Sequence, residues 1–390
     1  MKQYKYLIIG GGLTGDAATR GIRELDGDGS IGLISQEPDP PYMRPNLSKG
    51  LWKGRPIEKI WRRTEERSDL ILDRKATKLD PGKKTVQDDQ GEEYTYEKLL
   101  IATGGSPIHL PFDDGNIIYF RDFQDYQRLR KMAEEKEHFV VIGGGFIGSE
   151  IAAALTMVGA KVTMIFLEQA ISGLVFPSEL SNYLNDYYRE KGVEVIPNDS
   201  VAGIEKEGER FIVRTKSGRS IETDGVVAGI GIRPNLDLAK EAGLDVKNGI
   251  VVNERLEASA ADIYAAGDVA NFYHPAFGER TRVEHEDNAV SMGKMAGQNM
   301  AGGDETYKRI PMFYSDLFDH GYEAVGELNS ELETVSDWEE QFQKGVVYYL
   351  GGGRVRGVLL WNFWKQVGSA RALMMEKGPF KAEDLKGKIK

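Results

Sequence analysis

The sequence predicts an α/β protein with two similar parallel-sheet domains and a smaller α+β domain at the C-terminus. Three observations support this prediction: a strand, glycine turn and helix near residue 139, the same pattern at the start of the chain, and a change of texture after Met312. The two glycine turns lie about 130 residues apart. Since one such turn normally holds one pyrophosphate, they indicate two Rossmann-like nucleotide-binding domains.

The second pattern begins with Phe139–Ile142, which has the length and β-branched content of a buried parallel strand. Gly143, Gly145 and Gly148 follow in G-x-G-x-x-G spacing, before an alanine-rich stretch suited to a helix. Such glycines allow a tight turn, let backbone N–H groups approach a pyrophosphate and let the helix pack close to the strand. The alternative for either turn alone is a sharp turn without a ligand.

The first pattern begins with the apolar run Tyr4–Ile9. Gly10, Gly12 and Gly15 repeat the spacing, and Asp16–Leu25 is the expected helix. The next strand is predicted at residues 30–35, and an acid near its end usually binds a ribose hydroxyl. Glu37 is therefore a candidate, with a plain loop carboxylate as the alternative.

Length and composition exclude several classes of protein. A chain of 390 residues is long enough for two or three domains. It has no cysteine, which excludes a disulfide scaffold, a catalytic thiol, a redox-active cysteine pair and a cysteine-ligated iron–sulfur cluster. Met1–Tyr6 leads directly into the first strand, leaving no room for a signal peptide, and no apolar stretch approaches a membrane-spanning length of about 20 residues. We therefore expect a cytoplasmic protein.

The net charge of −11 argues against general nucleic-acid binding. Between Arg44 and Arg67, however, eight basic residues face three acidic ones. This segment is either a solvated surface with ion pairs or a docking patch for an acidic partner. Within it, Asn46 or Ser48 would cap a short helix that carries Lys49.

After Met312, short β-branched or aromatic segments alternate with turns. The predicted strands are Tyr322–Leu328, Gly345–Leu350 and Val355–Trp361, and the last two form a hairpin. Three further segments are a closing helix, a charged connection and a frayed tail. These are Asn362–Met375, Asp337–Lys344 and Lys381–Lys390, respectively.

The segment PPYMRPNLSKGLW (residues 40–52) resembles the one after the second strand in apoptosis-inducing-factor-like flavoproteins and in ferredoxin and rubredoxin reductases. These proteins are FAD-dependent pyridine-nucleotide reductases. The likeness covers nearly the whole chain and continues through six further stretches. They are LLIATGGSP (99–107), GIGIRPN (229–235), DIYAAGDVA (262–270), RVEHEDNAVSMGKMAGQNMAG (282–302), FYSDLFDHGYEAVGEL (313–328) and GVVYYL…GVLLWNFW (345–364).

In this family, ATGG closes the first half of the FAD domain and A-G-D opens its return. The second glycine turn lies between them, so the resemblance implies an NAD domain inserted into a discontinuous FAD domain. The expected division is FAD-binding at 1–112 and 236–310, NAD(H)-binding at 113–235, and a C-terminal domain at 311–390.

The resemblance also implies an FAD site. Two positions in it depart from relatives: Gln36 is commonly acidic, and Tyr314 is tryptophan in the best-known members. Glu286, beside the site, is tryptophan in ferredoxin reductases, so an electron path is not transferable from them. For Asp268 the alternative role is a helix cap. The expected FAD residues are Gly10, Gly12, Gly15, Gln36, Glu37, Arg44, Lys49, Ala76, Thr103, Gly104, Arg121, Asp268, Glu284, His285 and Tyr314.

The implied NAD site follows the second glycine turn. Glu168 comes after the predicted strand Lys161–Phe166 and has no arginine near it in sequence until Arg189. A carboxylate there accepts from a ribose 2′-hydroxyl and repels a 2′-phosphate, which favours NADH over NADPH. The expected NAD residues are Gly143, Gly145, Phe146, Ile147, Gly148, Glu150, Glu168, Gly231 and Glu284.

The resemblance implies three catalytic residues, Lys49, Glu150 and His285. In the family, a lysine of the P-x-L-S-K segment pairs with this glutamate beside flavin N5. The ammonium would stabilise the negative charge that arrives with a hydride, and the carboxylate would hold the lysine in place. From the residues alone, the alternative is a surface lysine and a glutamate favoured by the helix dipole. No metal-ligand spacing is present among the five histidines.

Two functions follow from the resemblance. The first is an FAD-dependent oxidoreductase that takes hydride from NADH and passes electrons to a small acidic iron–sulfur protein such as ferredoxin or rubredoxin, with quinones, monodehydroascorbate and oxygen as other acceptors. The second is a slow, NADH-responsive redox sensor that forms a charge-transfer complex and changes its association state, with a homodimer as one possible state.

Overall fold

The computed structural model describes residues 1–390, which form two compact units. Unit 1 comprises Met1–Pro45, Pro56–Ser106 and Arg233–Pro311. Unit 2 comprises Asn46–Arg55, Pro107–Ile232 and Met312–Lys390. Strands β7 (Gly105–Pro107) and β16 (Ile232–Pro234) contain two of the points where the chain passes from one unit to the other. None of the helices has the length and apolar character needed to span a membrane.

Unit 1 is built on a seven-stranded sheet in the order β3-β2-β1-β6-β5-β4, with β19 beside β6. Its apolar strands are buried on both faces, as expected of parallel strands covered by other elements. Five strands are parallel: β3 (Asp69–Ile71), β2 (Ile31–Ile34), β1 (Lys2–Ile9), β6 (Glu93–Ile101) and β19 (Ile263–Ala265). The antiparallel strands are β5 (Thr85–Asp88) and β4 (Ala76–Asp80).

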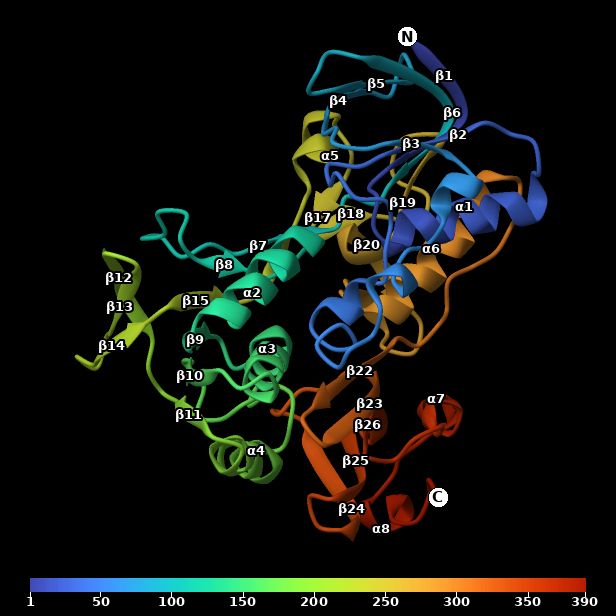
Figure 1. Cartoon of the computed structure of the whole chain (residues 1–390). Coiled ribbons are helices and arrows are strands. Elements are labelled where there is room, and N and C mark those ends of the chain that lie inside the picture. Colours follow the sequence, from blue (N-terminus) through green and yellow to red (C-terminus); the bar gives the residue numbers. More distant parts are fainter. The chain divides into compact units, whose positions relative to one another are not determined.

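Helices α1 (Leu13–Leu25) and α6 (Glu286–Met300) lie side by side in unit 1 (Figure 1). Glycines allow this close approach: a Cβ on Gly297 would overlap the carbonyl oxygen of Ala18, and one on Gly21 that of Lys294. The remaining elements of unit 1 are α5 (Asp237–Glu241), a four-stranded sheet of β17 (Val246–Lys247), β18 (Gly249–Val251), β20 (Ala270–His274) and β21 (Glu279–Thr281), and three 3₁₀ helices at Ile57–Lys59, Thr64–Glu66 and Gly267–Val269.

Unit 2 has its own parallel sheet, in the order β11-β10-β9-β15-β8. Its strands are β8 (Ile118–Tyr119), β9 (His138–Ile142), β10 (Lys161–Ile165), β11 (Val193–Ile196) and β15 (Gly225–Ala228). The helices are α2 (Phe123–Glu135), α3 (Phe146–Met157) and α4 (Ser178–Glu190). An antiparallel sheet of β12 (Val201–Glu207), β13 (Arg210–Thr215) and β14 (Ser220–Thr223) follows β11 in the chain.

The C-terminal residues of unit 2 form an antiparallel sheet in the order β22-β23-β26-β25-β24. The strands are β22 (Met312–Leu317), β23 (His320–Gly326), β24 (Glu333–Glu340), β25 (Lys344–Gly351) and β26 (Arg354–Trp361), and helices α7 (Val367–Met375) and α8 (Ala382–Leu385) follow. Together with the two nucleotide-type sheets, this sheet confirms the predicted fold class.

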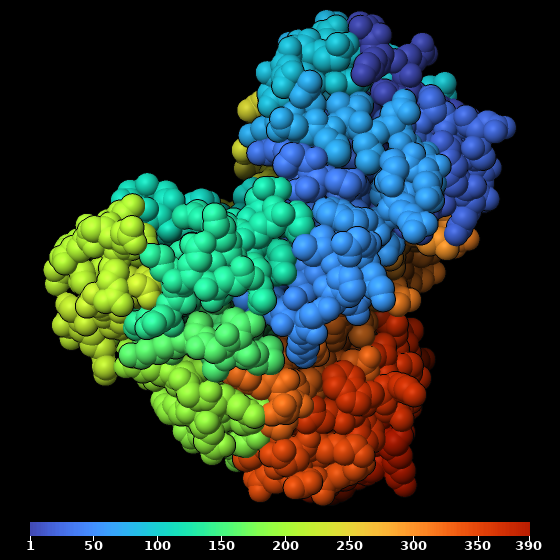
Figure 2. Space-filling view, viewed as in Figure 1, coloured from blue at the N-terminus to red at the C-terminus, as the bar shows by residue number.

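The C-terminal sheet packs against α4 within unit 2, and Figure 2 shows the orange residues lying against the yellow-green ones. Buried His320 on β23 lies 2.7 Å from the Tyr183 hydroxyl of α4, measured from Nε2 to Oη. The rings of Tyr187 and His320 are 4.5 Å apart. These aromatic contacts hold the C-terminal sheet against α4 of the same unit.

Four predictions of local structure are wrong. Residues 337–340 belong to strand β24 rather than to a connection, and the closing helix begins at Val367 rather than at Asn362. Residues 381–390 are not frayed, because Leu385 and Ile389 are buried and the Ile389 N–H donates to the Tyr348 hydroxyl. Lys49 does not lie on a helix but in turns after the 3₁₀ helix Arg44–Leu47.

Candidate functional site

The glycine turn of unit 1 leaves room for a ligand at one glycine only. Gly10 has a φ of +125°, and a Cβ there would overlap the carbonyl oxygen of Ala102. A Cβ on Gly15 would overlap the carbonyl oxygen of Gly10. By contrast, nothing lies within 4 Å of a Cβ built on Gly12, which precedes α1 without a side-chain cap. The open space therefore lies over the free N–H groups of a helix N-terminus.

The turn of unit 2 has the same construction. Gly143 has a φ of +111°, and its Cβ would overlap the carbonyl oxygen of Gly229. A Cβ on Gly148 would overlap the carbonyl oxygen of Gly143, whereas Gly145 has open space and precedes α3 without a side-chain cap. Both turns thus offer free N–H groups and the positive end of a helix dipole, which fits the pyrophosphate of a dinucleotide.

Glu37 in unit 1 is held by two of its neighbours. The Tyr42 hydroxyl donates to its Oε2 and Arg44 to its Oε1, each at 2.5 Å. The Arg44 guanidinium also lies 5.0 Å from the centre of the Tyr42 ring. The structure therefore brings together two expected FAD residues, Glu37 and Arg44, while Gln36 is exposed to solvent.

The Thr103–Gly104 segment is bonded to Asn235 within unit 1. The Thr103 hydroxyl donates to the Asn235 carbonyl, and the Asn235 amide donates to the Thr103 carbonyl, both at 2.9 Å. The Asn235 N–H donates to the Gly104 carbonyl. Ala76 lies apart from this contact in β4, opposite Asp88 of β5. Asn235 was quoted as part of a motif but not assigned to the site, and its amide completes this link.

Three expected residues lie in or after the A-G-D motif (Ala266–Asp268) in unit 1. Asp268 lies in a 3₁₀ helix, and its carbonyl accepts from Arg282 at 3.1 Å. Glu284 forms an ion pair with Arg282. Burial lowers the pKa of His285 to about 4, although the nearby carboxylates Asp268 and Asp287 act in the opposite direction. His285 is therefore a neutral imidazole at physiological pH, a state that the sequence did not reveal.

A buried ion pair joins Lys49 and Glu150 in unit 2. The Lys49 Nζ and Glu150 Oε2 are 2.7 Å apart, and their side chains are 12% and 3% exposed. Glu150 projects from the second turn of α3, two residues after Gly148 of the glycine turn. Removing one partner of such a pair leaves an unpaired charge in a dry environment and costs about 3–5 kcal/mol.

Two serine hydroxyls that sequence reasoning did not assign to the site also donate to Glu150. Ser48 donates to Oε2 and Ser315 to Oε1, each at 2.5 Å. The Lys49 ammonium lies 5.4 Å from the centre of the Tyr314 ring. Ser48 and Ser315 stand within quoted motifs, but nothing in the sequence indicated that both reach the same carboxylate.

Two of the expected NAD residues, Phe146 and Ile147, lie at the start of α3 in unit 2. Phe146 is its first residue and contacts Phe313, with ring centres 5.2 Å apart. Ile147 is exposed, at 38%, and would contact a Cβ on Gly229. Gly231 has a φ of +94°. Arg121 lies elsewhere in the chain, where its backbone N–H donates to Asp125 of α2.

Glu168 lies three residues beyond the end of β10, and its carboxylate makes no ion pair or side-chain hydrogen bond. The next arginine in sequence is bound elsewhere: Arg189 donates to Asp186 and to the Val195 carbonyl. The charge of the Glu168 carboxylate is therefore not neutralised by Arg189, the first arginine that follows it in the sequence.

Most basic residues of the segment from Arg44 to Arg67 take part in ion pairs. Three guanidinium groups, those of Arg20, Arg62 and Arg67, converge on Asp16, which is fully buried. Burial alone would raise the pKa of Asp16, but hydrogen bonds from Arg20, Thr64 and Arg62 lower it. The members of the segment in ion pairs are Arg44, Lys49, Lys53, Arg62, Arg63 and Arg67. This favours a solvated, ion-paired surface over a docking patch.

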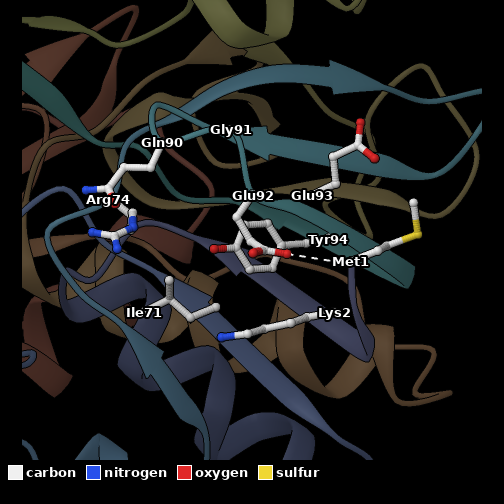
Figure 3. A pocket seen from close by; sticks show the side chains of 9 residues that line it. All are labelled: Met1, Lys2, Ile71, Arg74, Gln90, Gly91, Glu92, Glu93 and Tyr94. Atoms are coloured by element: carbon white, nitrogen blue, oxygen red, sulfur yellow. Dashed lines mark ion pairs between the residues drawn. The ribbon is translucent and has the colours of Figure 1, made fainter.

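A pocket of about 440 Å³ lies at the end of the unit 1 sheet that is opposite the glycine turn (Figure 3). It is lined by Lys2 and Tyr94, at the amino ends of β1 and β6, together with Arg74 and Glu92. The glycine turn follows the carboxyl end of β1, so this pocket is separate from the candidate nucleotide site.

Comparison with known proteins agrees with this geometry. A family model described as pyridine nucleotide-disulphide oxidoreductase matches residues 4–293. A second, described as apoptosis-inducing factor, mitochondrion-associated, C-term, matches residues 296–339 and 336–376. The chain has no cysteine, so it cannot carry the redox disulfide after which the first family is named.

The chain is similar to mitochondrial apoptosis-inducing factor 1 of Dictyostelium discoideum, with 34% identity over 97% of this chain and 79% of that protein. It is also similar to the 5,5'-dehydrodivanillate O-demethylase ferredoxin reductase subunit of Sphingobium sp., with 33% identity over 96% and 94%. A solved structure, the covalent putidaredoxin reductase–putidaredoxin complex, matches with a TM-score of 0.91 and 28% identity over 98% and 95%. The chain therefore belongs to the pyridine nucleotide-disulphide oxidoreductase family, in its apoptosis-inducing-factor-like and ferredoxin-reductase-like branch, and is a flavoprotein oxidoreductase that uses FAD and a pyridine nucleotide.

Proposed function

We propose that the chain oxidises NADH and passes the electrons to a small acidic iron–sulfur protein of the ferredoxin or rubredoxin type. Bound FAD would supply the redox chemistry, namely two-electron uptake from a reduced nicotinamide and one-electron release. The protein supplies binding, orientation and a fixed electric field. In this proposal residues 1–112 and 236–310 bind FAD, residues 113–235 bind NADH, and residues 311–390 form the C-terminal domain.

The buried Lys49–Glu150 pair is the observation that carries the proposal. Glu150 holds the Lys49 ammonium at one position, and the low exposure of both groups keeps its field from being screened by water. An ammonium held in this way stabilises the negative charge that arrives with a hydride. His285, the third proposed catalytic residue, is neutral because burial lowers its pKa to about 4, so it adds no second positive charge.

The preference for NADH over NADPH rests on Glu168. Its carboxylate has no partner, and Arg189 is bound to Asp186, so the end of β10 presents an acceptor for a ribose 2′-hydroxyl and a repulsive charge for a 2′-phosphate. We therefore infer that NADH is the electron donor.

An external acceptor is proposed because the chain has no thiol through which to relay electrons. The similar Sphingobium protein is named a ferredoxin reductase subunit, and the similar solved structure is a complex with putidaredoxin. Both names support a small iron–sulfur protein as the partner. Quinones, monodehydroascorbate and oxygen are the other acceptors to be tested.

Similarity to apoptosis-inducing factor supports a second candidate function. In this alternative the chain reacts slowly with NADH, retains a long-lived charge-transfer complex and changes its association state.

Anaerobic stopped-flow reduction by NADH tests the proposed role of the ion pair. We expect Lys49→Ala to retain FAD but to lower the rate constant of flavin reduction about 100- to 1000-fold, the range seen when one charge-stabilising group is removed. Lys59→Ala is the matched control, because Lys59 is a lysine of the same basic segment but is exposed and makes no ion pair. Equal rate constants in wild type and Lys49→Ala would remove Lys49 from the mechanism.

Mixing the reduced protein with a panel of acceptors separates the two candidate functions. Fast reoxidation by a ferredoxin or rubredoxin supports the reductase. Persistent long-wavelength absorbance together with dimerisation after NADH addition supports the sensor and contradicts the reductase.

A further inference from the structure

Strand β22 of the C-terminal sheet contacts both partners of the Lys49–Glu150 pair, one on each face. Phe313 and Ser315 point towards α3, where they meet Phe146 and Glu150. The alternate residue Tyr314 lies over the Lys49 ammonium. This arrangement follows from strand geometry, because successive side chains point to opposite faces of a sheet.

Residues 46–55 are fastened to the same strand by a second contact. Lys53 pairs with Asp316 at 3.0 Å, on the same face as Tyr314. These residues belong to unit 2, although the chain on both sides of them belongs to unit 1. One short strand therefore holds Glu150 from one side and the Lys49 segment from the other.

The contact of Ser315 with Glu150 is buried and specific. Ser315 is 1% exposed, and its hydroxyl donates to Glu150 Oε1, while Ser48 and Lys49 occupy Oε2. The carboxylate thus has both oxygens bonded, which fixes the plane of the carboxylate and the direction of its lone pairs towards Lys49. Without Ser315, Oε1 loses its hydrogen bond, and only the contacts of Oε2 with Ser48 and Lys49 still orient the carboxylate.

Buried tyrosines close the environment of Glu150 on the same side. Tyr322 is opposite Ser315 in the strand register, and both Tyr322 and Tyr188 of α4 are buried. Burial, followed by the Glu150 carboxylate, raises the pKa of both tyrosines well above the usual value of 10. Both tyrosines are therefore neutral, and Lys49 is the cation that pairs with the Glu150 carboxylate.

We propose that Ser315 is a positioning residue, contributed by the C-terminal sheet, that fixes the Glu150 carboxylate and through it the Lys49 ammonium. This inference rests on the proposed function of the ion pair and extends it to the C-terminal domain. Ser315 does not touch the reacting groups but acts through Glu150.

A double-mutant cycle tests the proposal by anaerobic stopped-flow reduction with NADH. We expect Ser315→Ala to slow flavin reduction about 3- to 30-fold, which is less than the full loss of a hydrogen bond to a charged group, because Ser315 acts only through Glu150. In the Lys49→Ala background the same substitution should have no further effect, because Ser315 acts through Lys49. Equal slowing in both backgrounds, or no slowing in either, would overturn the proposal.

Two variants separate positioning from a general loss of stability. Ser315→Thr keeps the hydroxyl and should retain the wild-type rate constant, whereas a loss as large as that of Ser315→Ala would contradict the proposal. Ser181→Ala is the matched control, because Ser181 is also buried in unit 2 but its hydroxyl has no hydrogen-bond partner. It should leave the rate constant unchanged.

Amine labelling provides a measurement that does not depend on turnover. We expect Lys49 to react faster with an acylating reagent in Ser315→Ala than in wild type or in Ser181→Ala, as quantified by peptide mass spectrometry of the folded protein. Unchanged labelling would contradict positioning by Ser315. If Lys49→Ala proves silent in reduction, the proposed function of Lys49 fails, while labelling still decides whether Ser315 positions it.

Discussion

His285 illustrates how burial sets the charge of a single residue. Burial lowers its pKa to about 4 from the usual 6.5, despite the nearby carboxylates of Asp268 and Asp287. Between those two pH values the unfolded chain binds a proton at this residue and the folded chain does not. The free energy of unfolding therefore falls as the pH drops from about 6.5 to about 4.

We predict that His285→Asn removes about 1–3 kcal/mol of this pH-dependent loss, since one pKa unit corresponds to 1.36 kcal/mol. Urea unfolding at several pH values between 7 and 4 measures it. His109→Asn serves as the control, because His109 is 61% exposed at the surface. A pH slope in His285→Asn equal to that of wild type would mean that the histidine already takes up its proton in the folded state.

At the scale of the element, each glycine turn contains one glycine that the fold requires and another that leaves space for a ligand. A Cβ on Gly148 would overlap the carbonyl oxygen of Gly143, whereas one on Gly145 meets open space. Gly145 has a φ of −81° and a ψ of −165°, which alanine also adopts. We expect Gly148→Ala to destabilise the protein by about 2 kcal/mol or more. Gly145→Ala should keep its stability within about 1 kcal/mol but raise the NADH concentration needed for half-maximal reduction.

Urea unfolding together with the NADH dependence of flavin reduction checks both variants. If Gly145→Ala bound NADH as well as wild type does, the turn of unit 2 would not hold the pyrophosphate.

At the scale of the whole molecule, charge limits how an acidic partner is attracted. The chain carries a net charge of −11, and six of the eight basic residues between Arg44 and Arg67 are already in ion pairs. Long-range steering of an acidic protein is therefore weak. We predict that the rate constant for reoxidation by an acidic ferredoxin changes less than about threefold between 50 and 500 mM salt. A steep decrease with salt would instead indicate a basic docking patch.

The sequence was sufficient to predict features formed by residues that follow one another in the chain. Both nucleotide-type turns were predicted because strand, glycines and helix follow one another in the chain. The contact of Ser315 with Glu150 was not, since 165 residues separate them and only packing of the C-terminal sheet on α3 brings them together. The protonation state of His285 could not be predicted from the sequence for a similar reason, because it depends on how far residues distant in the chain bury the imidazole.

Polar composition explains two of the wrong predictions. Strand β24 carries Asp337, Glu339 and Glu340 at the edge of its sheet, where charged side chains are common, so its sequence looks like a loop. The lysine-rich end of the chain is ordered by its two apolar residues, Leu385 and Ile389, which are buried. In both segments a few tertiary contacts outweigh the local composition.

The double contact made by β22 has a consequence for engineering this chain. Substitutions in the strand alter one face at a time, but inserting or deleting a single residue exchanges the two faces. Such an indel would turn Tyr314 towards the helix that carries Glu150 and Ser315 towards residues 46–55. Loop grafts and chimeras that join within this strand should therefore conserve its length, or change it in steps of two.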